Sequence, residues 1–277
     1  MLPFQRFLVV GAGKMGGALV EGWLAQGVPP SSITLIDPAF TAGLGPWTSR
    51  GVTCLPSLDT FNGDAPDLLM LAVKPQMMGE VLPALASFDR GELTVVSIAA
   101  GTTLETLQSA FPKATLVRTM PNTPAAIGAG MTAAYSVNEG AATRGGVTTL
   151  LEAVGKVIWV DSEDAMDAVT AVSGSGPAYV FHMVEALAEA GESLGLSAET
   201  AQILARQTVV GAGALLGQSD ETAAQLRCNV TSPGGTTAAG LAELMETGRL
   251  ADLMRNTVKA AHRRSRELAA SKPVSSS

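Results

Sequence analysis

The stretch FLVVGAGKMGGAL, residues 7–19, places a GxGxxG motif between an apolar, β-branched run and a predicted helix. In the strand–turn–helix unit that binds dinucleotides, Gly11 allows the tight turn, Gly13 lets the backbone approach a pyrophosphate, and Gly16 lets the helix pack closely on the strand. The first helical turn offers free N–H groups and a positive dipole end to the phosphates. We therefore predict a dinucleotide site; the alternative is a glycine-rich turn without a ligand. The predicted cofactor-binding residues of this loop are Gly11, Ala12, Gly13, Lys14, Met15 and Gly16.

Short apolar runs alternate with helical stretches from this loop up to about residue 160. Such runs are typical of strands buried on both faces of a parallel sheet. After residue 161 the strand signal stops, and the chain is helical and rich in Ala, Gly, Leu and Met. We therefore predict an α/β fold, with an N-terminal Rossmann-like, doubly wound sheet over residues 1–161 and an all-α dimerisation domain over residues 162–277. The predicted strands span 7–10, 33–36, 68–73, 93–98, 116–119 and 157–160, and the predicted helices of the second domain span 177–194, 198–217, 235–247 and 249–270.

The composition fits two domains with sizeable apolar cores, because 47% of the 277 residues are hydrophobic. The net charge of −7 argues against nucleic acid as a partner, since phosphate binding needs a basic surface. Cys54 and Cys228 have no CxxC or histidine companion, so we expect neither a metal site nor a disulfide. We see no apolar stretch of membrane-spanning length and no secretory leader, so we expect no membrane association and a cytoplasmic location.

The helices predicted at 177–194 and 198–217 are apolar around most of their circumference. In the first of them, Glu185, Glu189 and Glu192 fall on one narrow face. Helices of this kind must be buried on most sides, and a domain of this length has little interior in which to bury two. We therefore predict that a second copy of the chain covers them in an obligate dimer. The alternative is the apolar core of a monomer.

The second predicted strand is followed by Asp37, about 20 residues after the glycines, where a carboxylate accepts a hydrogen bond from the ribose 2′-hydroxyl of a dinucleotide. A carboxylate also repels a 2′-phosphate, and no Arg or Lys follows before Arg50. We therefore expect NADH to be preferred over NADPH. The alternative is that Asp37 only caps a turn with Pro38.

Three further segments lie at the ends of predicted strands, at the edge of the sheet where ligands bind in open α/β folds. They are AVKP at 72–75, SIAAG at 97–101 and MPNTPA at 120–125. Their small residues and prolines suit a rigid, close-fitting wall for a flat ring, whereas each segment alone would pass for an ordinary strand-to-helix turn. The predicted cofactor-binding residues in these segments are Ala72, Val73, Lys74, Pro75, Ala99 and Asn122.

The segment VTSPGGTT, residues 230–237, leads into the predicted helix at 235–247. Its Pro-Gly-Gly turn exposes consecutive backbone N–H groups, which form an anion site suited to a carboxylate. The alternative is a simple Ser/Thr helix cap, but a cap needs only one hydroxyl and no glycines. The predicted substrate-binding residues of this loop are Ser232, Pro233, Gly234, Gly235, Thr236 and Thr237.

Together with SGSGPAY at 173–179, these segments resemble the signature blocks of the pyrroline-5-carboxylate reductase family. The order and approximate spacing agree from Gly11 to about Glu267, and SPGGTT is the most specific block. The resemblance implies a Rossmann domain followed by a helical domain that interlocks with its dimer mate, and it leaves open further assembly into a decamer. The family often uses NADPH, whereas Asp37 favours NADH in this chain.

The resemblance also implies roles for individual residues. Residues 72–75 and Ala99 line the nicotinamide pocket, and the SPGGTT loop holds the substrate carboxylate. Thr237 lies by the ring nitrogen as the catalytic residue, and Glu163 also reaches the substrate, a small imino acid.

The implied reaction is the reduction of 1-pyrroline-5-carboxylate to L-proline, the last step of proline biosynthesis, by hydride transfer from NAD(P)H to the cyclic C=N bond. A protonated imine is already electrophilic, so the protein need only position it and supply a hydrogen bond. Two alternatives stay open at this point. One is a reductase of another cyclic imine, such as a six-membered ring, and the other is a nucleotide-sensing module without catalysis.

Overall fold

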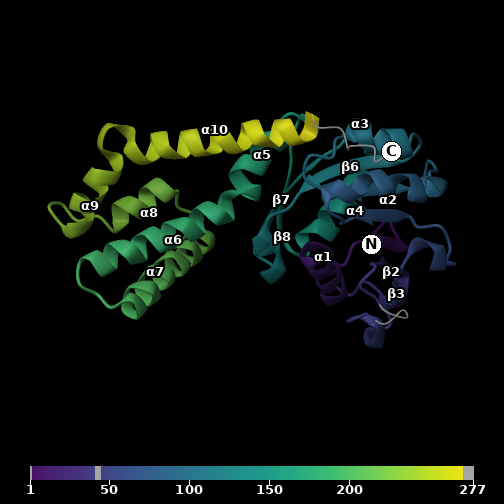
Figure 1. Ribbon diagram of the computed structural model, residues 1–277, viewed down its shortest axis with the longest axis horizontal. Coiled ribbons are helices and arrows are strands. Elements are labelled where there is room, and N and C mark those ends of the chain that lie inside the picture. Colours follow the sequence, from purple (N-terminus) through teal and green to yellow (C-terminus); the bar gives the residue numbers. More distant parts are fainter. Residues whose placement is uncertain (1, 41–44, 271–277) are drawn as a thin grey trace. The chain divides into compact units, whose positions relative to one another are not determined.

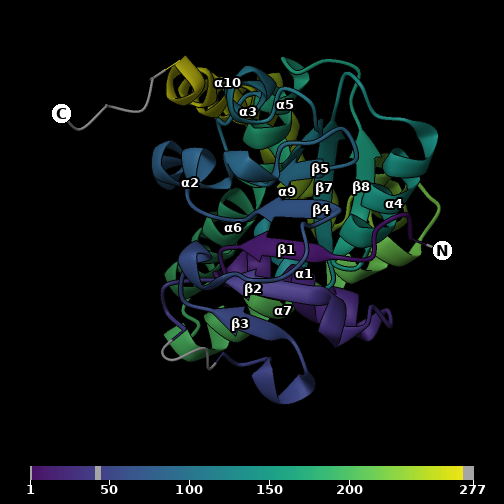
Figure 2. The same cartoon turned by 90° about the vertical axis from the view of Figure 1, so that its right-hand side faces the viewer.

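The computed structural model describes residues 2–40 and 45–270. Its first part is built on one eight-stranded sheet with the order β3-β2-β1-β4-β5-β6-β7-β8. Figure 1 and Figure 2 together label the strands. Neighbouring strands are parallel except for β6 and β7, which are antiparallel. The strands are β1 (Phe7–Val10), β2 (Ile33–Ile36), β3 (Thr53–Leu55), β4 (Leu68–Leu71), β5 (Thr94–Ser97), β6 (Thr115–Met120), β7 (Gly130–Tyr135) and β8 (Gly155–Trp159).

All the predicted strands are present, and the Rossmann-like, doubly wound fold is confirmed. Since β1 lies between β2 and β4, the chain crosses from one side of β1 to the other, and such a switch point opens a crevice at the carboxyl ends of the strands. The prediction missed β3 and β7, and β7 runs antiparallel to β6 in an otherwise parallel sheet. The reason is local: β3 is very short, and β7 reads GMTAAY, which holds small residues in place of a β-branched run.

Two apolar cores cover the two faces of the sheet. Helices α1 (Lys14–Ala25) and α4 (Ala141–Glu152) pack on one face, and α2 (Met78–Leu85) and α3 (Leu104–Ala110) pack on the other (Figure 2). Alternate residues of each strand serve the two cores, as Val9 and Leu8 do in β1. Because both faces are covered, ligands can reach the sheet only at its edges.

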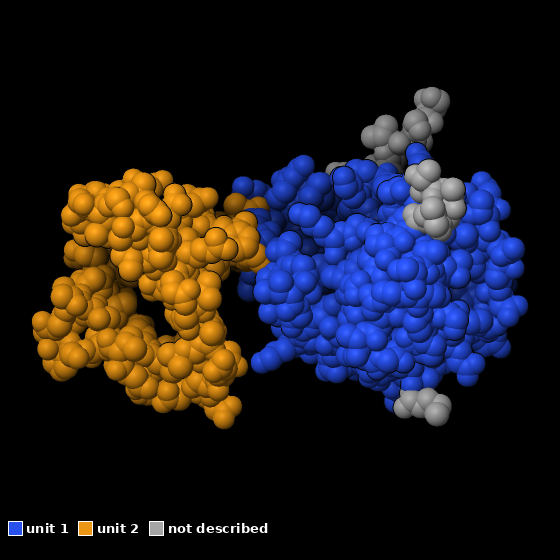
Figure 3. Space-filling view, turned by 90° about the horizontal axis from the view of Figure 1, so that it is seen from below, with its two compact units in different colours: residues 1–175, 261–277 blue, residues 176–260 orange. Residues whose placement is uncertain are grey.

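The chain divides into two compact units (Figure 3). The first runs to Ser175 and also includes the segment from Ala261 onward, and the second is Gly176–Ala260. This division differs from the expected boundary after residue 161. Helix α5 (Ala165–Val169) contacts β6 and β7, and Ser265 donates a hydrogen bond of 2.7 Å to Asp167, so both segments belong with the sheet although neither contains a strand.

The second unit is helical, as predicted. Its helices are α6 (Gly176–Ser193), α7 (Ala198–Gln218), α8 (Ala223–Asn229), α9 (Thr236–Met245) and most of α10 (Arg249–Ala270), and a π-helical turn, η7 (Thr170–Gly174), precedes α6. The prediction missed α8, which lies in a stretch that it treated as a connection. No helix among residues 2–40 and 45–270 is both long and apolar enough to cross a membrane.

The paired helices α6 and α7 bury very little of their apolar surface within the chain. Their buried cluster consists of Ala188, Ala201 and Ala205, with Val184 packed against it. Large apolar side chains of both helices are exposed, among them Phe181 at 63%. Exposed apolar side chains gathered in this way are typical of interaction surfaces, protein–protein interfaces among them.

Candidate active site

The glycine loop has the geometry that a dinucleotide needs. Gly11 has a φ of +102°, and a Cβ there would lie 2.6 Å from the carbonyl oxygen of Ala72, so only glycine fits. A Cβ on Gly16 would lie 2.1 Å from the Gly11 carbonyl oxygen, which is the close helix–strand contact that the sequence predicted. Gly13 has nothing within 4 Å of where its Cβ would be, so the backbone is open to a ligand on that side.

The start of α1 is free to bind an anion. Its cap is Gly13, which supplies no side-chain hydrogen bond, and the first intrahelical bond runs from the Gly17 N–H to the Gly13 carbonyl. The N–H groups of Lys14, Met15 and Gly16 therefore have no partner in the helix. Three consecutive donors at a positive dipole end match the phosphates of a dinucleotide.

Asp37 lies directly after β2 and accepts two backbone hydrogen bonds. Its Oδ2 accepts the Ala12 N–H at 2.7 Å, and its Oδ1 accepts the Ala39 N–H at 2.9 Å. The carboxylate therefore does cap the turn after β2, which was the alternative interpretation, and it also ties that turn to the glycine loop. Each oxygen keeps a lone pair for a further donor, so a ribose hydroxyl can still bind.

Arg50, the nearest cation after Asp37 in the sequence, is engaged elsewhere. Its Nη1 lies 2.7 Å from Oε2 of Glu21, and this hydrogen bond holds the pKa of the Glu21 carboxyl below its ordinary value. Glu21 lies seven residues along α1 from Lys14, which is about 10 Å from the helix start at 1.5 Å per residue. Arg50 is therefore paired with Glu21, and it makes no ion pair with Asp37 in the described part of the chain.

The other cofactor candidates lie at the same edge of the sheet. Residues 72–75 follow β4, Ala99 follows β5, and Asn122 follows β6, while the glycine loop follows β1. The Ala72 N–H donates to the Val10 carbonyl at 2.8 Å, so the first of these segments adjoins the glycine loop directly. Ala99 is buried, whereas Lys74 and Pro75 are exposed. The structure thus brings the predicted cofactor residues to one edge, and their individual contacts with a cofactor stay a prediction.

Asn122 has a structural role that the sequence did not indicate. Its Oδ1 accepts the Met131 N–H at 2.8 Å, and its Nδ2 lies 3.2 Å from Oγ and 3.3 Å from the carbonyl oxygen of Ser173. The side chain thereby joins the end of β6, the start of β7 and the π-helical turn. Most of its hydrogen-bonding capacity is used within the protein.

Glu163 is held by a buried arginine that sequence reasoning missed. Arg118 in β6 is 4% exposed, and its Nη1 lies 2.9 Å from Oε1 of Glu163. The same oxygen accepts the Leu104 N–H at 2.7 Å, at the first residue of α3. The one available signal was a charged residue inside the otherwise uncharged strand TLVRTM.

The SPGGTT loop leads into α9 without a side-chain cap. Gly235 is the cap residue, and the first helical bond runs from the Ala239 N–H to its carbonyl, so the N–H groups of residues 236–238 have no partner in the helix. Gly234 has a φ of +69°, a backbone conformation that favours glycine. The hydroxyls of Ser232, Thr236 and Thr237 make no hydrogen bond within the described part of the chain. A simple Ser/Thr cap is therefore not what these residues form, and the loop presents donors suited to a carboxylate.

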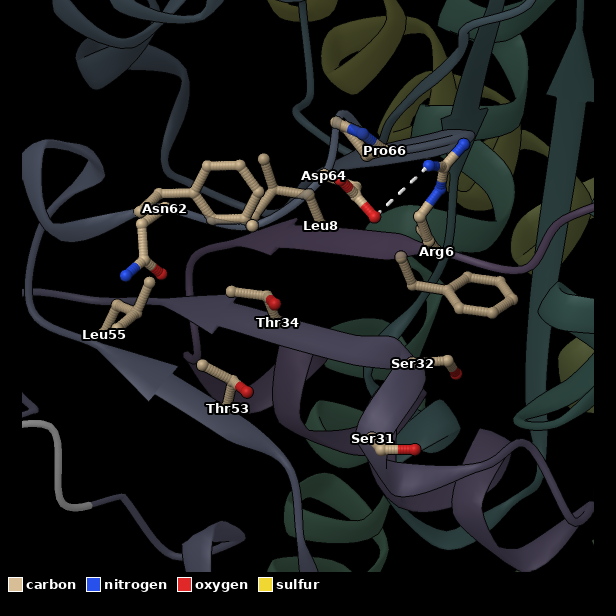
Figure 4. A pocket seen from close by; sticks show the side chains of 13 residues that line it. Arg6, Leu8, Ser31, Ser32, Thr34, Thr53, Leu55, Asn62, Asp64 and Pro66 are labelled. Atoms are coloured by element: carbon tan, nitrogen blue, oxygen red, sulfur yellow. Dashed lines mark ion pairs between the residues drawn. The ribbon is translucent and has the colours of Figure 1, made fainter.

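A separate cavity of about 270 Å³ lies at the opposite, amino edge of the sheet (Figure 4). Arg6, just before β1, lines it and lies 3.9 Å from Asp64. None of the predicted site residues lines this cavity. Because ligands of open α/β sheets bind beyond the carboxyl ends of the strands, the carboxyl edge remains the candidate active site.

Comparison with known families assigns both parts of the chain. Residues 163–268 match the family described as pyrroline-5-carboxylate reductase dimerisation, and residues 6–101 match the family described as NADP oxidoreductase, coenzyme F420-dependent. The first match covers the apolar helices α6 and α7, for which the sequence predicted a partner subunit.

Several relatives match nearly the whole chain. The chain is 41% identical over 262 residues to a pyrroline-5-carboxylate reductase of Glycine max, covering 94% of each protein, and 41% identical over 266 residues to one of Pseudomonas aeruginosa, covering 95% of this chain and 97% of that protein. A solved pyrroline-5-carboxylate reductase structure from Coxiella burnetii superposes with a TM-score of 0.87 at 34% identity, covering 96% of this chain and 99% of that one. The Plasmodium falciparum pyrroline carboxylate reductase, solved with NADP bound, superposes with a TM-score of 0.77 at 27% identity, covering 98% of this chain and 100% of that one. The chain therefore belongs to the pyrroline-5-carboxylate reductase family.

Proposed function

We propose that this protein reduces 1-pyrroline-5-carboxylate to L-proline, with NAD(P)H and one proton consumed and NAD(P)⁺ released. The observation that carries the proposal is the match to pyrroline-5-carboxylate reductases over 94–95% of the chain at 41% identity. A match of this extent spans both the glycine loop and the SPGGTT loop.

The residues at the carboxyl edge fit a nicotinamide dinucleotide. The open side of Gly13 and the three free N–H groups of α1 suit a pyrophosphate, and the small side chains of Ala72 and Ala99 leave room for a flat ring. When bound there, the dinucleotide supplies the hydride. The protein's own residues then have three tasks, which are to hold the phosphates, to orient the ring and to present the imine carbon.

The SPGGTT loop is the proposed substrate site. The free N–H groups at the start of α9 bind the substrate carboxylate, and the Thr237 hydroxyl accepts a hydrogen bond from the protonated imine nitrogen. As the nitrogen becomes an amine, the same hydroxyl keeps a hydrogen-bonding partner. A positioned, already electrophilic C=N needs no further acid or base at the carbon.

We also propose that NADH is the better cofactor. The Asp37 carboxylate accepts from a ribose diol and repels a 2′-phosphate, and Arg50 is held by Glu21 at 2.7 Å. The structure of the Plasmodium falciparum relative has NADP bound, so family membership alone does not decide this preference.

The homodimer is the proposed working unit. A decamer is the larger assembly that the family resemblance leaves open, and sedimentation experiments test for it. The exposed apolar faces of α6 and α7 support a partner subunit. A cytoplasmic location is supported by the two cysteines, which are both free thiols. The net charge of −7 supports a small-molecule substrate in preference to nucleic acid.

Steady-state oxidation of NADH and NADPH tests this function. The purified protein is supplied with 1-pyrroline-5-carboxylate or with the six-membered cyclic imino acid, and absorbance of the reduced cofactor is followed. We expect a higher kcat/KM with the five-membered ring. Preference for the six-membered ring would identify a different imine reductase, and dinucleotide binding without oxidation would identify a binding module.

A further inference from the structure

We propose that Arg118 is a positioning residue for the reaction, because it holds the Glu163 carboxylate so that one of its oxygens stays available to the substrate. The inference rests on the proposed function, and within it on the substrate role that the family resemblance implies for Glu163. It adds a residue that lies outside the motifs quoted above.

Arg118 occupies a buried position, where a charged side chain loses its hydration. It lies in β6, between β5 and β7, and its side chain is 5% exposed. Burial of an ionised side chain costs free energy that an ion pair only partly returns, and a well-packed apolar residue usually stabilises a fold as well or better. The presence of a guanidinium in this strand is therefore better explained by its ion pair with Glu163 than by an effect on the stability of the fold.

The contacts divide the Glu163 carboxylate into a fixed and an unfixed oxygen. Oε1 accepts two hydrogen bonds, one from Arg118 at 2.9 Å and one from the Leu104 N–H at 2.7 Å. Oε2 makes no hydrogen bond to any other residue that the structure describes. Two donors from different elements, β6 and α3, restrict the rotation of the side chain before any ligand arrives, which is how positioning lowers the cost of binding.

The Glu163 side chain is partly exposed. Its side chain is 29% exposed and lines a cavity of about 250 Å³ together with Thr103, Asp164 and Arg266. A carboxylate attracts the protonated imine nitrogen and repels the carboxylate of the same substrate. Glu163 thus suits the cationic end of the substrate.

The test compares substitutions at Arg118 and Glu163 in the full-length enzyme. The variants are R118M, R118K, E163Q and the double variant R118M/E163Q, with R90M as a matched control. Arg90 is another partly buried arginine, bound to Asp67 and to two carbonyls at the amino edge of the sheet. For each variant we would measure KM and kcat for the imine, the Kd for NADH, and the melting temperature.

We expect R118M to raise KM for the imine by roughly tenfold or more, the effect of losing one hydrogen bond to a charged group, with the NADH Kd unchanged. E163Q should raise KM similarly, and the double variant should be no worse than E163Q alone, because both changes break one interaction. R118K should recover part of the loss, since it keeps the charge and one donor. R90M should lower the melting temperature without a change in KM.

An unchanged KM in R118M, measured per folded enzyme, would overturn the inference, as would losses that simply add in the double variant. If R118M does not fold, R118K decides: a raised KM with normal NADH binding supports the role, and a normal KM refutes it. A wild-type enzyme that does not reduce the imine contradicts the proposed function itself. If the wild-type enzyme reduces the imine and the Arg118 variants have the wild-type KM, only the role of Arg118 is contradicted.

Discussion

Replacement of Thr237 by alanine should lower kcat/KM for the imine by roughly 10–150-fold and leave the melting temperature nearly unchanged. The activity range follows from the loss of one hydrogen bond to a charged group, which costs about 1.5–3 kcal/mol when the bond is made in the transition state. The cofactor Kd should not change, because the proposed phosphate site is the glycine loop and not α9.

The small effect on stability follows from the position of Thr237. It is the second residue of α9, its side chain is exposed, and its hydroxyl makes no hydrogen bond among the described residues. The cap of this helix is Gly235, so the substitution removes no cap. Alanine is also the better helix former, by a few tenths of a kcal/mol.

Thr222→Ala is the matched control. Thr222 caps α8, and its side chain accepts the Gln225 N–H at 3.2 Å. Loss of a cap of this kind costs about 1 kcal/mol, which lowers the melting temperature by roughly 2–4 °C. We expect this variant to lose stability and keep its turnover, which is the reverse of the Thr237 result.

The assay measures kcat/KM per folded molecule beside thermal unfolding monitored by circular dichroism. Near-normal turnover in Thr237→Ala would refute the catalytic role. The backbone N–H groups at the start of α9 would then remain as the proposed substrate site.

Four other perturbations are predicted. Asp37→Ser should raise the ratio of NADPH to NADH kcat/KM about tenfold, roughly 1.4 kcal/mol of removed repulsion, and a wild-type preference for NADPH that this variant leaves unchanged would contradict the assignment. Gly13→Val should keep its melting temperature, because nothing lies within 4 Å of its Cβ position, yet weaken NADH binding by about tenfold in a fluorescence titration. Val210→Glu, at a position 56% exposed on α7, should dissociate the oligomer in sedimentation experiments while far-ultraviolet circular dichroism stays unchanged. Burial raises the pKa of the Asp67 carboxyl, but hydrogen bonds from Arg6 and the backbone outweigh burial and lower the pKa overall. The folded state is therefore stabilised above pH about 4, and this stabilisation should be lost as acid protonates the carboxylate. Asp67→Asn should flatten that part of the pH dependence of the free energy of unfolding.

The loop segments at the carboxyl edge of the sheet could largely be predicted from the sequence, because each segment has a local sequence pattern of its own. A glycine loop needs a strand before it and a helix after it, and residues 7–25 supply all three in order. The ends of the buried strands are marked where the short apolar runs stop, so the segments after β4, β5 and β6 could be located from those runs. Parallel pairing then places them at one edge without further information.

The parts that were missed depend on contacts distant in sequence. β7 has little strand propensity of its own and forms because it pairs with β6 and β8. Tertiary pairing of this kind overrides weak local preference. The same holds for the boundary between the units, because the contact of Ser265 with Asp167 joins residues 98 positions apart.

Side-chain partners were the least predictable feature of the site. The sequence places Asp37 after β2, but it does not show that the carboxylate also bonds to Ala12 of the glycine loop. Likewise, Arg118 reads as an isolated charge in a strand, and only the fold brings it to Glu163. Partners of this kind are set by packing across the sheet and not by spacing along the chain.

Transfer of deuterium from the reduced nicotinamide to the product tests the proposed reaction most directly. The enzyme is incubated with 1-pyrroline-5-carboxylate and NADH carrying deuterium at both C4 positions, and the product is analysed by chiral chromatography, mass spectrometry and NMR. The proposed hydride transfer predicts L-proline with one deuterium on the ring carbon that adjoins nitrogen and bears no carboxylate. Proline without deuterium, or oxidised cofactor without proline, would contradict the proposed function.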